Sequence, residues 1–397
     1  MAKARPKKSE ILVINNVAQI GLKRFPAEHY AVVKEAKDPD AIVVRSQDLH
    51  KYEFGPSLRA VGRAGAGVNN IPVAALSKRG IPVFNAPGAN ANAVKELVLA
   101  GMLIAARNLA PALEFIKKLD NNDLEARVED GKKQFAGSEL PGHTLGVVGL
   151  GKIGSLVADA AIRLGMNVQG YDPHITVEAA WSLPSQVKRA ASIEELIKTS
   201  HFVSLHVPLG EKTRHLINGR NIEHFRHGAV LLNFSREGIV AEDAVAKGLK
   251  SHSLKWYVTD FPTDDLLGHP GVIALPHLGA STREAEDNCA IMVVDQVRDY
   301  LEQGNLQNAV NFPDAAMPRE APFRLAIANA NVPDMLSSIS HALGRRKINI
   351  HNMLNKSKGE TAYTLVDADS PVPFDVIKEL SGLNGVLSVR YLPVVAG

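Results

Sequence analysis

The amino-acid sequence predicts an α/β protein that is built around doubly wound parallel sheets and ends in a smaller α/β unit. Short apolar runs rich in β-branched residues alternate with helical segments, and this alternation starts again after the polar stretch 120–142. Such alternation is typical of parallel sheets covered by helices. A glycine-rich turn directly follows one of the apolar runs. At 397 residues, the chain is long enough for two or three domains.

The first part of the chain predicts strands over 10–17, 41–46 and 81–88, and helices over 72–80 and 91–108. The apolar window inside the second helix is about half the length needed to cross a bilayer, so we expect a buried helix rather than a membrane span. Six further strands are predicted after residue 142, at the spacing of βαβ units in a nucleotide-binding domain. They begin near Thr144, Asn167, Phe202, Ala229, Lys255 and Val272.

A second boundary is expected at the proline-rich segment 310–322. About 75 residues follow it, and their pattern of apolar runs and helical segments reads strand, helix, strand, strand, helix, strand. That order is ferredoxin-like.

The glycine-rich turn "VVGLGKIG" has Gly149, Gly151 and Gly154 in the spacing GxGxxG. The first glycine permits a tight turn, the second permits a pyrophosphate to approach the backbone, and the third permits close packing of helix on strand. Asp172 ends the next predicted strand, where a carboxylate can accept hydrogen bonds from a ribose 2′-hydroxyl and repel a 2′-phosphate. The turn therefore predicts a dinucleotide site that prefers NAD to NADP.

Three polar features follow other predicted strands, where ligands bind in such sheets. They are Arg236, the aspartates of "TDFPTDD" (259–265) and His277. Oxidation of an alcohol needs a base for the hydroxyl proton, which histidine can be, and a neighbouring carboxylate fixes the imidazole tautomer. An arginine can hold a substrate carboxylate by a forked pair of hydrogen bonds.

Composition excludes several other classes of protein. A net charge of +3 is too small to favour nucleic acid or an anionic membrane, and the N-terminal residues lack the apolar stretch of a signal peptide. The single cysteine, Cys289, excludes an internal disulfide and a cysteine metal cluster. We expect a cytoplasmic enzyme without a bound metal.

The segments "GLGKIG…YDP", "NFSREGIV", "TDFPTD" and "PHLGAS" resemble the D-2-hydroxyacid dehydrogenase family, over essentially the whole chain. The resemblance implies a Rossmann-type NAD domain inserted in a flavodoxin-like substrate domain, followed by a ferredoxin-like ACT domain. The implied boundaries are 1–95 and 286–313 for the substrate domain, 96–285 for the NAD domain, 314–321 for a linker and 322–397 for the ACT-like domain.

The resemblance also implies roles for particular residues. Arg236 orients the substrate, His277 is the acid–base, and Asp264 stands where the family has a catalytic glutamate, with Asp265 as the competing candidate. Asp260 is expected to replace a ribose contact that the family usually makes from the position of Thr259. The implied cofactor-binding residues are Gly149, Gly151, Lys152, Ile153, Gly154, Asp172, Val207, Phe234, Ser235, Arg236, Asp260, His277 and Gly279.

The implied substrate-binding residues are Arg45, Ser46, Arg63, Ala66, Gly67, Arg236 and His277. Two arginines suit a phosphate, so the resemblance implies NAD-dependent oxidation of 3-phospho-D-glycerate to 3-phosphohydroxypyruvate, the first step of L-serine biosynthesis. It also implies a homodimer or homotetramer, with L-serine as an effector bound by Asn329, Asn331 and Asn349. Two alternatives remain, a glyoxylate or hydroxypyruvate reductase and a non-catalytic NAD-sensing protein of the same fold.

Overall fold

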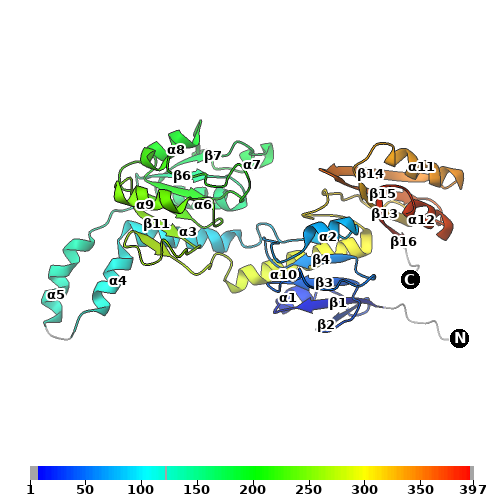
Figure 1. Cartoon of the computed structure of the whole chain (residues 1–397), viewed down its shortest axis with the longest axis horizontal. Coiled ribbons are helices and arrows are strands. Elements are labelled where there is room, and N and C mark those ends of the chain that lie inside the picture. The colour runs from blue at the N-terminus through cyan, green and yellow to red at the C-terminus, as the bar shows by residue number, and fades with distance from the viewer. Residues whose placement is uncertain (1–7, 121–122, 394–397) are drawn as a thin grey trace. The chain divides into compact units, whose positions relative to one another are not determined.

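The computed structural model describes residues 8–120 and 123–393. The chain divides into two compact units: unit 1 comprises residues 1–90 and 283–397, and unit 2 comprises residues 91–282. Unit 1 is therefore discontinuous in sequence. It contains two separate sheets, whereas unit 2 contains one (Figure 1).

The first sheet of unit 1 has five parallel strands in the order β2-β1-β3-β4-β5. This is the flavodoxin-like order 2-1-3-4-5. Its strands are β1 (Ser9–Ile14), β2 (Tyr30–Val33), β3 (Ala41–Val44), β4 (Ala60–Arg63) and β5 (Val83–Phe84). The helices are α1 (Gln19–Leu22), α2 (Val73–Lys78) and α10 (Arg283–Gln303). Gly62 brings β4 close to α10, because a Cβ at that position would lie 2.7 Å from a methyl group of Val293.

The second sheet of unit 1 is antiparallel, in the order β14-β15-β13-β16. Its elements are β13 (Phe323–Ala330), α11 (Met335–Arg345), β14 (Ile350–Lys358), β15 (Thr361–Ala368), α12 (Phe374–Ser381) and β16 (Val386–Pro393). The expected order of strand, helix, strand, strand, helix, strand is confirmed. Both helices contribute to one core with the sheet, in which Ile339 and Leu380 are fully buried.

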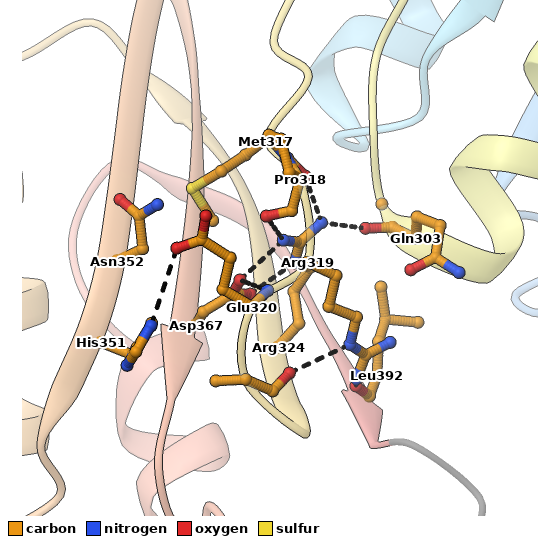
Figure 2. Close-up of polar contacts among 12 residues, drawn as sticks. Gln303, Met317, Pro318, Arg319, Glu320, Arg324, His351, Asn352, Asp367 and Leu392 are labelled. Atoms are coloured by element: carbon orange, nitrogen blue, oxygen red, sulfur yellow. Dashed lines mark hydrogen bonds and ion pairs between the residues drawn. The ribbon is translucent and has the colours of Figure 1, made fainter.

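A buried arginine joins this second sheet to the preceding segment (Figure 2). Arg324 of β13 is fully buried and forms two hydrogen bonds, of 2.5 and 2.7 Å, with the carboxylate of Asp367 in β15. Its guanidinium also donates to the main-chain oxygens of Gln303, Met317 and Pro318, over 2.9–3.1 Å. The segment expected to be a linker is thus bound to the end of α10 and to β13 through one side chain.

The sheet of unit 2 has seven parallel strands in the order β12-β11-β10-β9-β6-β7-β8. This confirms the predicted doubly wound sheet, since it is the order 3-2-1-4-5-6 with one added strand. The strands are β6 (Thr144–Val148), β7 (Asn167–Tyr171), β8 (Lys188–Arg189), β9 (Phe202–Leu205), β10 (Ala229–Asn233), β11 (Leu254–Thr259) and β12 (Val272–Ala274).

Helices cover this sheet, and it is buried on both faces. Alternate residues of β10 enter different cores, Leu231 in one and Val230 and Leu232 in the other, which explains why the strands read as continuous apolar runs. The helices that pack on its strands are α3 (Ala91–Ala106), α6 (Lys152–Arg163), α8 (Ile193–Thr199) and α9 (Glu242–Lys250). Unit 2 also contains α4 (Leu109–Lys117), α5 (Leu124–Gly131), α7 (Val177–Trp181) and the 3₁₀ turns η1 (Lys132–Phe135) and η2 (Ile222–His224).

Within the residues that the structure describes, no single helix is long and apolar enough to cross a membrane. Helices α3 and α4 reach that length and hydropathy only as a pair, and they are bent by 68° at their junction.

Replacement of Arg324 by methionine should destabilise the second sheet of unit 1 by about 3–5 kcal/mol, because the buried Asp367 carboxylate loses its partner. Arg345→Met is the matched control: Arg345 forms an exposed ion pair with Glu379 in the same part of the chain, and such pairs contribute about 0–1 kcal/mol. Hydrogen exchange at the amides of β13 and β15 measures the opening free energy. Equal and small losses in the two variants would contradict the assigned role of Arg324.

Candidate active site

The glycine-rich turn between β6 and α6 has the geometry of a dinucleotide cradle. Gly149 has a φ of +88°, and a Cβ there would lie 2.6 Å from the main-chain oxygen of His206. A Cβ on Gly154 would lie 1.9 Å from the oxygen of Gly149, so α6 packs directly on the turn. A Cβ on Gly151, by contrast, would meet nothing within 4 Å. Open space therefore faces the N-terminus of α6, where free N–H groups favour an anion.

Asp172, directly after β7, is bound to this turn. One carboxylate oxygen accepts a hydrogen bond from the amide of Leu150 and the other from the amide of His174, each at 2.9 Å. A carboxylate offers about four acceptor sites, so two of these bonds leave capacity for a hydroxyl group. The structure thus brings Asp172 to the cradle, and its contact with ribose stays a prediction. Lys152 and Ile153 are the first two residues of α6.

A hydrogen bond joins the segments that follow β9 and β10, beside the glycine-rich turn. The hydroxyl of Ser235 donates to the main-chain oxygen of Val207 over 2.9 Å. Phe234 is buried against α3, where a Cβ on Gly101 would lie 3.0 Å from its ring. Arg236 is exposed and uses one N–H to donate to the oxygen of Ser235. Because a guanidinium has five N–H donors, the side chain can also hold a carboxylate.

His277 follows β12 in a conformation that few non-glycine residues adopt. Its φ is +56°, in the left-handed region. Its ring is edge-on to that of Phe261, with 5.0 Å between centroids. The buried carboxylate of Asp260 accepts hydrogen bonds from the amides of Leu278 and Gly279, both 2.7 Å long. These two bonds fix the turn that presents the imidazole.

The ribose contact that we expected for Asp260 stays a prediction. Its side chain is 1% exposed, and each of its oxygens accepts a hydrogen bond from the 278–279 backbone. Thr259, at the preceding position, is also buried, and its hydroxyl accepts a hydrogen bond from the amide of Phe261 over 3.1 Å. Both residues therefore stabilise the loops after β11 and β12.

His277 has two candidate carboxylate partners, Asp264 and Asp265. Asp264 and Asp265 are both exposed, and among the described residues neither forms a hydrogen bond or ion pair with His277. Asp265 lines a cavity together with Arg214 and Glu237, whereas Asp264 does not line it. The pairing of Asp264 with His277 stays a prediction.

The predicted substrate arginines of unit 1 follow neighbouring strands. Arg45 comes directly after β3 and Arg63 ends β4, and Nε of Arg63 donates to the main-chain oxygen of Arg45 over 2.9 Å. The guanidinium of Arg63 lies over Gly65, where a Cβ would be 1.8 Å from Nη1. Nη2 of Arg45 also lies 2.7 Å from a carboxylate oxygen of Glu286. The remaining predicted residues of this group, in the loops after these strands, are Ser46, Ala66 and Gly67.

Comparisons with known proteins point to one family. Residues 99–279 match the family described as D-isomer specific 2-hydroxyacid dehydrogenase, NAD binding domain. The D-3-phosphoglycerate dehydrogenase of Haemophilus influenzae is 31% identical over 416 residues, which cover 97% of this chain and 97% of that protein. The chain belongs to the D-isomer-specific 2-hydroxyacid dehydrogenase family. The expectation of an NAD-dependent dehydrogenase is confirmed at the level of this family.

Two further similarities agree with this family. The D-3-phosphoglycerate dehydrogenase of Methanocaldococcus jannaschii is 39% identical over 300 residues, 73% of this chain and 54% of that protein. The structure of NAD⁺-bound 3-phosphoglycerate dehydrogenase from Entamoeba histolytica has 27% identity and a TM-score of 0.60, over 77% of this chain and 99% of that one. The chain thus spans about half the length of the Methanocaldococcus protein and nearly all of the Haemophilus protein.

The three amides that family resemblance assigns to an effector have partners inside unit 1. Asn329 is buried and donates to the main-chain oxygen of Ala330 over 2.7 Å. Asn331 donates to the oxygen of Gly359 and Asn349 to the carboxylate of Asp369. Binding of an effector by these residues stays a prediction, and it would have to use their remaining donors and acceptors.

One residue beside the NAD cradle was missed in the sequence. His206 follows β9, and its Nε2 shares a 2.8 Å hydrogen bond with the hydroxyl of Ser204. Its Nδ1 is buried and has no hydrogen-bond partner among the described residues. Burial lowers the pKa of His206 to about 4. The signal in the sequence is the position of this histidine directly after an apolar strand, as for Asp172.

The lowered pKa of His206 predicts a loss of stability in weak acid. The unfolded chain takes up the proton near the ordinary pKa of about 6.5 and the folded chain only near 4, so stability is complete above about 6.5 and falls toward pH 4. Between pH 7 and pH 5 the loss from this group should be about 2 kcal/mol. Urea unfolding, followed by the fluorescence of Trp181 and Trp256 in unit 2, measures it at both pH values. His206→Gln should lose less stability over this interval, and an unchanged pH dependence would contradict the prediction.

Proposed function

We propose that this chain oxidises 3-phospho-D-glycerate to 3-phosphohydroxypyruvate with NAD, the first step of L-serine biosynthesis. The Haemophilus influenzae relative, matched over 97% of both chains, carries the name of that activity. In this molecule the proposal is carried by Arg45 and Arg63, which are joined by a hydrogen bond at the ends of β3 and β4. Two forked donors suit a phosphate. Glyoxylate and hydroxypyruvate carry no phosphate group, so a reductase of those acids is not favoured.

The residues of unit 2 supply the chemistry in this proposal. Gly151 and the N-terminus of α6 would hold the pyrophosphate of NAD, which would supply the hydride acceptor. His277 takes the proton of the substrate hydroxyl, because a positioned histidine is the commonest general base in enzymes. Arg236 holds the substrate carboxylate by charge-assisted hydrogen bonds. Asp264 is the proposed partner of the imidazole, and these roles disfavour a protein that only senses NAD.

The last four strands of unit 1 form the proposed ACT-type domain. Their order and antiparallel pairing support that assignment. L-serine is the proposed effector and a homodimer or homotetramer the proposed assembly, both by family resemblance. Asp334 precedes α11 with a φ of +66°, a conformation that glycine adopts without strain. Its carboxylate would oppose the carboxylate of a bound amino acid.

Replacement of His277 by alanine should lower kcat roughly 10²–10⁴-fold, because the proton loses its acceptor. The affinity for NADH should remain near that of the parent chain, since the cradle around Gly151 is unaltered. NADH formation and a fluorescence titration measure the two quantities. His227→Ala is the matched control, because this exposed histidine lies before β10, at the other end of the strand from Arg236. Near-normal turnover in the His277 variant would remove it from the mechanism.

Substrate identity is tested by replacing Arg45 and Arg63 singly with alanine. Loss of one charge-assisted pair to phosphate should lower kcat/KM for 3-phosphoglycerate roughly ten- to a hundredfold. Unphosphorylated D-glycerate should be nearly unaffected, because it never made those bonds. Arg59→Ala serves as the control at the opposite end of β4. An equal loss for both acids would show that the arginines maintain the fold and do not select phosphate.

A further inference from the structure

Arg45 already has an anionic partner within unit 1. Its Nη2 lies 2.7 Å from Oε1 of Glu286, and the two side chains are 34% and 41% exposed. Glu286 belongs to the first turn of α10, where the partial positive charge of a helix N-terminus stabilises a carboxylate. The arginine expected to bind phosphate is thus paired with a carboxylate that water can reach.

The surrounding charges show that this pair belongs to a single cluster. Arg63 is bound to the main-chain oxygen of Arg45, and Cys289 is buried one helical turn after Glu286. Burial raises the pKa of the Cys289 thiol, the charges of Arg63 and Arg45 lower it, and the charge of Glu286 raises it. Two cations and one carboxylate therefore act on the same buried group. Because Glu286 contacts Arg45 directly and Arg63 is bound to Arg45, an anion that binds both arginines also approaches Glu286.

Resting on the function proposed above, we propose that Glu286 is a specificity-determining residue whose carboxylate competes with the substrate phosphate for Arg45. A phosphate near its second ionisation carries up to two charges and three strong acceptor oxygens, so it can displace a single carboxylate. An acid that ends in a second carboxylate carries only one charge at that end, so it gains less from Arg45 in exchange for displacing Glu286. The partly exposed Glu286 side chain can turn into water when it is displaced. The site thereby favours phosphorylated hydroxy acids over dicarboxylic ones at some cost in affinity.

Glu286→Gln tests this inference. Glutamine preserves the size of the side chain and removes its charge, so KM for 3-phosphoglycerate and Ki for inorganic phosphate should fall roughly two- to tenfold, with kcat unchanged. Inhibition by a dicarboxylate such as malate should strengthen by at least as much, and KM for D-glycerate should not move. Glu284→Gln is the matched control: it removes the same charge from the same helical turn, and among the described residues no ion pair joins Glu284 to either arginine.

Different results would contradict the role of Glu286 and the proposed oxidation of 3-phosphoglycerate. A parent chain that does not oxidise 3-phosphoglycerate overturns the proposed function, whereas binding of inorganic phosphate still reports on Glu286. Equal effects of Glu284→Gln and Glu286→Gln would overturn the inference, since only the net charge of α10 would then matter. So would a gain from Glu286→Gln that persists in an Arg45→Ala background, where the guanidinium that pairs with Glu286 has been removed.

Discussion

In the sheet of unit 2 neighbouring strands run in the same direction, so their carboxyl ends, with the loops that follow them, meet at one edge. The glycine cradle follows β6, Asp172 follows β7, and Ser235 and Arg236 follow β10. His277 follows β12, whose pairing with β11 places Thr259 opposite Ala274. Residues that are more than a hundred positions apart are gathered by this pairing alone. Loss of the parallel register would disperse the site even if every side chain were retained.

The imidazole of His277 is positioned mainly through its backbone. A left-handed residue other than glycine costs about 1–2 kcal/mol, and hydrogen bonds to a charged acceptor contribute about 1.5–3 kcal/mol each. The two amide bonds to Asp260 are therefore sufficient to hold the turn in this conformation. A buried carboxylate that never touches the ring thus determines where the ring lies, which leaves the ring itself available to a substrate.

The sequence predicted those parts of the molecule that depend on local pattern. Gly149 and Gly154 have the close backbone contacts that their spacing indicated, and β6, β9 and β10 are buried apolar runs. β8 was missed because it comprises only two exposed residues, Lys188 and Arg189. The hydrogen bonds from the backbone of 278–279 to Asp260 were not predicted, because sequence does not show whether a carboxylate points toward nearby backbone or toward a ligand. Glu286 gave no signal, since its partner Arg45 is 241 positions away.

The discontinuity of unit 1 has a consequence for biosynthesis. The core of its first sheet includes Val293 and Val297 of α10, which the ribosome adds only after all of unit 2. At roughly 5–20 residues per second, the interval is on the order of 10–40 s. During that time the apolar face of β1, β3 and β4 lacks its covering helix α10. Residues 91–282, by contrast, are released as one uninterrupted segment. Nascent chains are therefore most exposed to aggregation and to chaperone binding at their N-terminal sheet, and unit 2 is the part that can mature first.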